Sequence, residues 1–231
     1  MAKRKRRRIT KKELKEDRFL ESAADLLYFL KHHSSKLVWG LLGVFVIFLS
    51  TRYFIQSRAK GEEEATFAFT SANSFLFAGR YQDARTKYEE ILQKYPSTTS
   101  GVKSLYYLGN LCYFLSEYDS SLDYYERYLA KSKDPLLAAA ALEGIGYCYE
   151  QKGDLQEAAR RYEEVFERHP KSIVAASALI SAARCYESLG NFESAEGCYE
   201  RVIGSFPETQ KAEEARKNRA FLKGMQAATA R

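Results

Sequence analysis

The feature that most constrains this chain is an internal repeat with a period of 37 residues. Four stretches align without a gap, and they begin at Ala65, Val102, Ala139 and Ala176. Their eighth position always holds a small residue: Ala72, Gly109, Gly146 or Ala183. A fixed period of this length is typical of solenoids, in which each unit buries its apolar face against its neighbours.

Three more columns of the repeat show what each unit folds into. A turn column holds Gly79, Ser116, Gly153 and Gly190. A second column of small residues follows it: Ala84, Ser121, Ala158 and Ala195. A third column is entirely tyrosine: Tyr88, Tyr125, Tyr162 and Tyr199. Because apolar residues recur at helical spacing on both sides of the turn, the pattern predicts one helix–turn–helix unit per repeat and an all-α fold.

The boundaries between repeats hold all four prolines of the chain: Pro96, Pro135, Pro170 and Pro207. Proline ends the second helix of a unit because it cannot continue the helical hydrogen-bond ladder. A hydroxyl residue follows three of these prolines closely, so Ser97, Ser172 and Thr209 are predicted to cap the next helix. Residues 208–231 are predicted to form a capping helix with a frayed tail, since the last unit of a solenoid needs a cover.

With these columns the chain resembles a tetratricopeptide-repeat protein over residues 65–207. The resemblance implies an α-solenoid of four helical hairpins. Its repeats would span 65–101, 102–138, 139–175 and 176–207. The chain departs from the family in its period, which is 37 residues where about 34 is usual, and in Cys112, Ser121 and Lys133 of the second repeat.

The resemblance also implies where partners bind, on the concave face made by the first helix of each repeat. In the first two repeats the implied peptide-binding groove holds Phe69, Asn73, Phe77, Tyr106, Tyr107, Asn110, Tyr113 and Phe114. The carboxylate clamp of chaperone-binding relatives needs a lysine where Phe69 and Tyr106 stand here, so an apolar or aromatic-rich segment is the expected ligand. Alternatively, several of these rings pack against the N-terminal junction or against a second copy.

An apolar segment precedes the repeats. Residues 37–51 are uncharged and nearly all apolar, and residues 37–55 enclose only Arg52. We expect one transmembrane helix over 37–55, with a linker or helix continuation at 56–64. A cleaved signal peptide is the alternative.

The N-terminal tail sets the expected orientation of that segment. Residues 1–36 hold 12 Lys and Arg against five Asp and Glu. The tail is therefore predicted to stay cytoplasmic, with a short amphipathic helix, and the C-terminal repeats to be periplasmic. The expected localisation is the cell inner membrane, crossed by a single pass.

This layout is similar to that of the inner-membrane tetratricopeptide proteins that accompany the SecYEG translocon as ancillary subunits. The resemblance implies a membrane-anchored adaptor for protein export, with the secretion translocon, periplasmic chaperones or exported chains as partners. A structural component of an envelope assembly or cell-division machine is an alternative. A nucleic-acid-associated protein that uses the basic run AKRKRRR is another.

The sequence holds little that points to an enzyme. It has three histidines, His32, His33 and His169, and it lacks a phosphate loop and a metalloprotease motif. We therefore expect no catalysis, no cofactor and no metal site. The four cysteines form no CxxC pair, and Cys185 with Cys198 is the one pair whose spacing allows a disulfide; buried free thiols are the alternative.

Overall fold

The computed structural model describes residues 28, 31 and 34–229. In this part of the chain every element is an α-helix, nine in all, and no strand is present. The helices are α2 (Ser34–Phe77), α3 (Tyr81–Lys94), α4 (Thr99–Phe114), α5 (Tyr118–Lys131), α6 (Pro135–Gln151), α7 (Leu155–Arg168), α8 (Ala175–Ser188), α9 (Phe192–Ser205) and α10 (Gln210–Thr229). The all-α fold class is confirmed. The basic run and the amphipathic helix predicted for the N-terminal tail lie outside the described residues.

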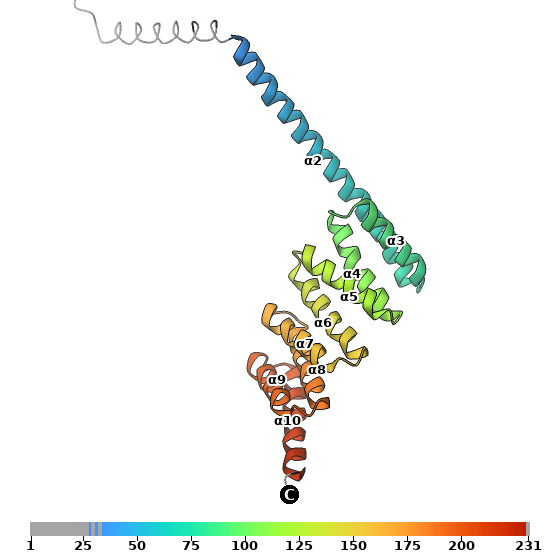
Figure 1. Cartoon of the computed structure of the whole chain (residues 1–231), viewed down its shortest axis with the longest axis vertical. Helices are drawn as coiled ribbons and strands as arrows, with labels where there is room; N and C mark the ends of the chain where they lie inside the picture. Colours follow the sequence, from blue (N-terminus) through green and yellow to red (C-terminus); the bar gives the residue numbers. More distant parts are fainter. Residues whose placement is uncertain (1–27, 29–30, 32–33, 230–231) are drawn as a thin grey trace, which may run out of the picture. The chain divides into compact units, whose positions relative to one another are not determined.

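The chain divides into two units, 1–59 and 60–231. The second unit is a stack of helical hairpins that runs from the C-terminal part of α2 to α10 (Figure 1). Within it helix α2 contacts α3 through the rings of Phe69 and Tyr88, which lie 5.6 Å apart. Each helix from α3 to α10 packs against the next one in sequence, and α6 also packs against both α4 and α8. The first helices of successive hairpins therefore lie side by side, as the repeat pattern predicts.

The turn column adopts a left-handed backbone in every repeat. Gly79, Gly153 and Gly190 have φ angles of 73°, 80° and 73°, and Ser116 has a φ of 63° in the second repeat. Glycine reaches this region without steric cost, whereas a side chain at the same angles is strained. The sharp turn of the hairpin explains why three of the four repeats use glycine there.

The columns of small residues let the two helices of a hairpin approach each other. A Cβ atom on Gly109 would lie 2.7 Å from the ring of Tyr125, and one on Gly146 would lie 2.4 Å from the ring of Tyr162. Both tyrosines are buried. The core tyrosine of each hairpin thus needs a residue with little or no side chain opposite it.

The helix caps agree only partly with the prediction. Thr209 does bond the first turn of α10, since its Oγ1 accepts from the backbone N–H of Ala212 at 3.2 Å. The cap of α4 is Thr98 instead of Ser97, because Thr98 has the extended backbone that a cap needs and its Oγ1 accepts from Gly101 N at 2.9 Å. Helix α8 begins only after Val174, which makes no side-chain cap.

The first unit contains the N-terminal part of α2, whose apolar side chains from 42 to 55 are exposed. Across the described residues, no helix is apolar over enough of its length to cross a membrane. The 15 uncharged residues of 37–51 would cover roughly 22 Å, against about 30 Å of hydrocarbon. The helix then continues through Arg52 and Arg58 without a break. The predicted span at 37–55 and the inner-membrane localisation are therefore wrong.

All four cysteines are free and buried. The thiol of Cys148 donates to Ser121 Oγ at 3.2 Å, and that of Cys198 contacts Glu163 Oε1 at 3.8 Å. Burial raises the pKa of the Cys185 thiol to about 11 and that of Cys198 to about 12. In the structure Cys185 and Cys198 are thus buried free thiols, the alternative that the sequence also allows.

Candidate functional site

The predicted binding positions of neighbouring repeats come together on one surface, which we call the first-helix face. It is formed by residues 66–77 of α2 together with α4, α6 and α8. Side chains bridge it between repeats: Thr66 Oγ1 lies 3.3 Å from Ser100 Oγ, and Ser177 Oγ donates to Glu143 at 3.0 Å. Arg184 donates to Glu150 at 3.5 Å. The positions implied by the repeat register therefore form one continuous surface.

Several of the predicted groove rings are packed at the edge of the core. The ring of Phe69 lies 5.3 Å from that of Tyr107, and Tyr107 stacks on the buried Tyr88 at 5.4 Å. Tyr106 lies 5.5 Å from Tyr107 and 5.7 Å from the buried Tyr128. These three rings, Phe69, Tyr106 and Tyr107, are half-buried, so each presents only one side to solvent.

A second group of rings connects the second repeat to the third. Tyr113 lies 6.2 Å from Tyr147, and Tyr147 meets the core ring of Tyr162 edge-on at 5.5 Å. Tyr113 and Tyr147 are both half-buried. The aromatic part of the first-helix face thus extends into the third repeat, beyond the predicted groove residues, which all lie in the first two repeats.

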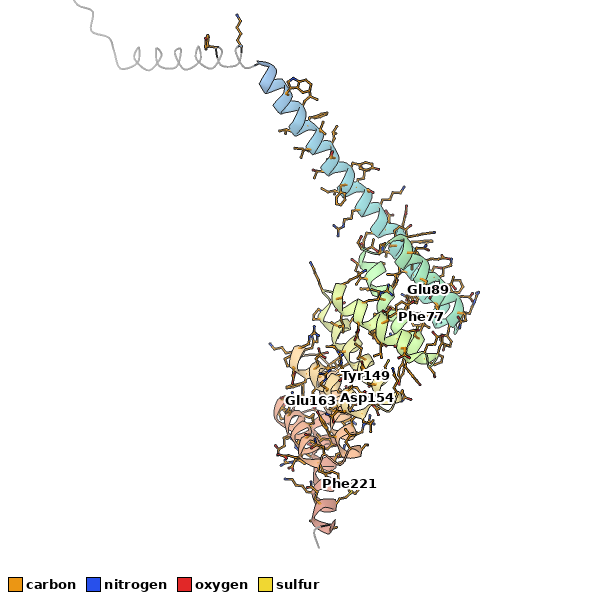
Figure 2. All side chains as sticks on the ribbon, in the orientation of Figure 1. Phe77, Glu89, Tyr149, Asp154, Glu163 and Phe221 are labelled. Carbon is orange, nitrogen blue, oxygen red and sulfur yellow. The ribbon has the colours of Figure 1, made fainter. Side chains whose placement is uncertain are left out.

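The remaining two predicted rings are exposed and lie next to hairpin turns. Phe77 ends α2, as Figure 2 shows, and it is 86% exposed. Phe114 ends α4 and is 61% exposed, with its ring 4.6 Å from that of Tyr81. The eight predicted residues therefore divide into rings that also hold the core, exposed rings at the turns, and two asparagines.

Both asparagines are already engaged by the core. Asn73 Oδ1 accepts from the hydroxyl of Tyr88, and Asn110 Oδ1 accepts from the hydroxyl of Tyr125 at 2.6 Å. The side-chain oxygens of both predicted groove asparagines are thus taken by tyrosines of the same repeat. The amide NH2 groups are the donors that remain for a ligand.

In the last two repeats a carboxylate replaces the asparagine as acceptor. The hydroxyl of Tyr162 donates to Glu150 at 2.7 Å, and that of Tyr199 donates to Glu187 at 3.0 Å. Sequence reasoning missed this exchange of acceptors. Its signal is visible in the repeat, because asparagine stands fifteen residues before the tyrosine in the first two repeats and glutamate stands twelve before it in the last two.

Glu143 is a half-buried carboxylate in the polar part of the first-helix face. It accepts from Ser177 Oγ and from the hydroxyl of Tyr147. Burial raises the pKa of Glu143 above its ordinary value, and burial beside this carboxylate raises the pKa of Tyr147 to about 12. The charged side chains on the helices of this surface are Lys103, Glu143, Glu150, Arg184 and Glu187, and Arg184 pairs with Glu150.

The described part of the chain holds no group of three or more His, Cys, Asp or Glu side chains placed to bind a metal ion. The chemistry that the first-helix face offers is that of contact: flat rings, amide donors and a few carboxylates. These groups suit the recognition of another polypeptide.

Comparisons with known proteins agree with this architecture. Two tetratricopeptide-repeat models match residues 69–135 and 137–208. No curated protein matches the chain in sequence.

Solved structures share the fold at low sequence identity. A tetratricopeptide repeat protein from Parabacteroides merdae is 18% identical with a TM-score of 0.58, and the match covers 71% of this chain and 61% of that one. A MamA protein is 18% identical with a TM-score of 0.56, and the match covers 73% of this chain and 87% of that one. The chain thus spans about three fifths of the first of these proteins.

Proposed function

Residues 69–208 make this chain a tetratricopeptide-repeat protein, and from that premise we propose that the first-helix face docks a segment of another protein. The chain then acts as a non-enzymatic adaptor that holds a partner along its repeats. The expected ligand is an extended or helical segment with apolar or aromatic anchors, and the amide donors of Asn73 and Asn110 are available to its backbone carbonyls.

The observation that supports this proposal best is the row of half-buried rings on the face. Tyr106, Tyr113 and Tyr147 are each held by ring contacts on one side and open on the other. A ring already fixed by its neighbours loses little conformational entropy when a partner covers it. Such rings are typical anchors of protein interfaces.

The polar part of the face would orient the partner. Glu143 is already desolvated and has lost the water that a fully exposed carboxylate would keep. A basic or hydrogen-bonding side chain of the partner could pair with it at modest further cost. We therefore expect the anchors of the partner to meet the rings and its basic side chains to lie toward α6 and α8.

A link to protein export depended on a membrane-anchored, exported body, so it loses its basis with the predicted span. Nucleic-acid binding would have to come from the basic run, which lies outside the described residues. Beyond residue 36 the chain holds 24 Lys and Arg against 25 Asp and Glu. A body so close to neutral lacks the positive field that nucleic-acid binding requires.

Site-specific photocrosslinking tests the proposal. A photoreactive phenylalanine would replace Tyr113, Tyr147 or, as a control, the exposed Gln93 of α3. We expect Tyr113 and Tyr147 to capture the same partner and Gln93 to capture none. Equal capture from Gln93, or none from the two tyrosine positions, would show that the first-helix face is not the binding surface.

A quantitative test follows with the captured partner. Tyr113→Ala and Tyr147→Ala should each weaken binding by about 1–2 kcal/mol, roughly five- to thirtyfold, if the ring is an anchor. The matched Tyr113→Phe and Tyr147→Phe variants keep the ring and should bind nearly as well as the parent. Unchanged affinity in the alanine variants would contradict the role of the rings.

A further inference from the structure

A cleft lies between the start of α6 and the loop that joins α7 to α8. Its volume is about 540 Å³, and Leu136, Arg168, His169, Lys171 and Ile173 are among its lining residues. The cleft belongs to the junction between the third and fourth repeats. Its lining residues include none of the rings or asparagines proposed to dock a partner on the first-helix face.

Two large aliphatic side chains are exposed at this cleft. Leu136 is 55% exposed and Ile173 is 85% exposed. They occupy the same column of the repeat, 37 residues apart. Exposed aliphatic side chains are ordinary when they are single, but a pair that lines one cleft marks a surface suited to an apolar ligand group.

His169 adds an unsatisfied polar atom to the same cleft. Its Nε2 is the one buried side-chain nitrogen or oxygen without a hydrogen-bond partner in the part of the chain that the structure describes. A buried polar atom without a partner has lost its hydrogen bonds to water and has gained none in the protein, which destabilises the fold. Native proteins therefore rarely leave such an atom unpaired, and a ligand that accepts a hydrogen bond from Nε2 would remove this cost.

The junction between the first and second repeats, here the first junction, shows which groups accept hydrogen bonds from residues in the same columns. Tyr95 stands in the column of His169, and its hydroxyl donates to Glu64 at 2.8 Å. Thr99 stands in the column of Ile173, and its backbone N–H donates to Glu62 at 2.9 Å. At this junction the chain itself supplies two carboxylates, from the acidic run 62–64 that directly precedes the first repeat.

At the third junction those carboxylates are missing. Leu136 and Ala138 occupy the columns of Glu62 and Glu64, 74 residues further along the chain. Neither can accept a hydrogen bond through its side chain. The third junction thus has a hydrogen-bond donor in His169 but lacks the acidic acceptors that are present at the first junction.

The charges around the cleft favour an acidic ligand. Arg168 and Lys171 line it, and no Asp or Glu does. Arg168 is paired with Glu164 at 2.9 Å, whereas Lys171 forms no ion pair with the described residues. Two carboxylates flank the lining residues along the chain. Asp134 is occupied as the cap of α6, where it accepts from the N–H groups of Leu136 and Leu137. Glu167 is paired with Arg201 at 3.9 Å.

We propose that this cleft binds an acidic segment of a partner protein that also carries an aliphatic side chain. A carboxylate of the segment accepts from His169 Nε2 and pairs with Lys171. The adjacent aliphatic side chain lies between Leu136 and Ile173. The segment thereby supplies from another chain what Glu62 and Glu64 supply at the first junction.

The test measures binding of a labelled peptide, fluorescein-Gly-Leu-Asp-Glu-Ile-Gly, to the full chain by fluorescence polarisation. The matched peptide has lysine at both acidic positions. We expect the acidic peptide to bind and the basic one to bind at least about tenfold more weakly, since the charge contacts are reversed. Saturating acidic peptide should also move the Nε2 resonance of His169 in a nitrogen-15 spectrum.

Two variants introduce the residue that another repeat has in the same column, so that the fold is kept: Ile173→Thr, after Thr99, and His169→Phe, after Phe206. A third variant, Lys171→Glu, reverses the charge of the unpaired lysine. Each should weaken the acidic peptide by about fivefold or more. The matched charge reversal Lys94→Glu on α3 and the groove variant Tyr113→Ala should leave its affinity unchanged.

Three results would overturn the proposal. One is the absence of binding by the acidic peptide at millimolar concentration. Another is equal affinity for the acidic and basic peptides, which would make the contact purely apolar. The third is binding with an unmoved His169 resonance and unchanged affinity in all three cleft variants, which would place the peptide elsewhere on the chain.

Discussion

The first two repeats and the last two keep the same core tyrosine but satisfy its hydroxyl differently. Tyr125 donates to the amide oxygen of Asn110, whereas Tyr162 donates to the carboxylate of Glu150. The position of the ring is set by packing against a small residue, which is glycine in both repeats. The partner of the hydroxyl is free to vary, provided that some acceptor reaches it.

This difference decides what each half shows on its surface. In the second repeat asparagine accepts from the core tyrosine. The position that holds glutamate in the last two repeats is therefore free for another residue, and it carries the half-buried ring of Tyr113. In the last two repeats glutamate accepts from the core tyrosine. The position that holds asparagine in the first two repeats is then free, and it holds Tyr147 in the third repeat and Arg184 in the fourth. The helix position that does not bond the core tyrosine thus holds Leu76, Tyr113, Tyr147 and Arg184 in the four successive repeats, so its rings lie in the two central repeats.

The largest effect should separate core rings from face rings. Tyr162→Ala removes a buried ring and should lower the free energy of unfolding by about 3–5 kcal/mol, because it leaves a cavity. Tyr106→Ala removes a half-buried ring and should cost about 1–2 kcal/mol. Urea denaturation of the two purified variants measures both. If Tyr106→Ala costs as much as Tyr162→Ala, the ring is core and does not serve as an anchor.

Removing only the hydroxyl should separate the two halves. Tyr162→Phe should cost about 1.5–3 kcal/mol, because its hydroxyl bonds a charged acceptor, while Tyr125→Phe should cost about 0.5–1.5 kcal/mol. Denaturant midpoints measure the difference. In a Glu150→Gln background, Tyr162→Phe should cost no more than Tyr125→Phe does. Equal costs in the parent chain would show that the charge of the acceptor does not matter.

A smaller effect should distinguish the turn of the second repeat from the others. Ser116 has a φ of 63°, so Ser116→Gly should stabilise the protein by about 0.5–1 kcal/mol after the entropy of the unfolded chain is included. The reverse change, Gly153→Ser, should destabilise by a similar amount. Melting temperatures of both variants test this. A loss of stability in Ser116→Gly would mean that its side chain stabilises the turn.

The smallest effect concerns pH. The pKa of Glu143 is raised by burial above its ordinary value of 4.5, so the folded protein holds this proton more tightly than the unfolded chain. The charged form therefore destabilises the fold above the folded pKa, and this cost disappears as pH falls through it. Glu143→Gln keeps an acceptor for Ser177 and should raise the melting temperature at pH 7 by about 2–4 °C.

At pH 4.5 the melting temperatures of Glu143→Gln and the parent should converge. The exposed Glu208→Gln is the matched control, and it should follow the parent at every pH. A gain in Glu143→Gln that persists unchanged at pH 4.5 would mean that the effect comes from packing and not from charge.

The sequence alone determined the all-α class, the hairpin units and the residues of each repeat column. These features depend on local pattern, because helical periodicity, turn glycines and small residues opposite a tyrosine recur at fixed spacing. The first-helix face was implied by the resemblance to tetratricopeptide-repeat proteins, and the repeat spacing then gave the residue numbers of its columns. The cap of α4 was misplaced by one residue, because Ser97 and Thr98 both have a suitable side chain and only the backbone angles distinguish them.

Tertiary structure alone decided how each side chain in those columns is used. The repeat register assigned these positions one common role, but Asn110 has a core tyrosine as partner, Phe69 and Tyr106 are partly buried, and Phe77 is exposed. The cleft at His169 likewise arises where two repeats meet. A repeat pattern gives the position of a residue within its unit, but burial and hydrogen bonding depend on the neighbouring unit, which the spacing within one repeat does not describe.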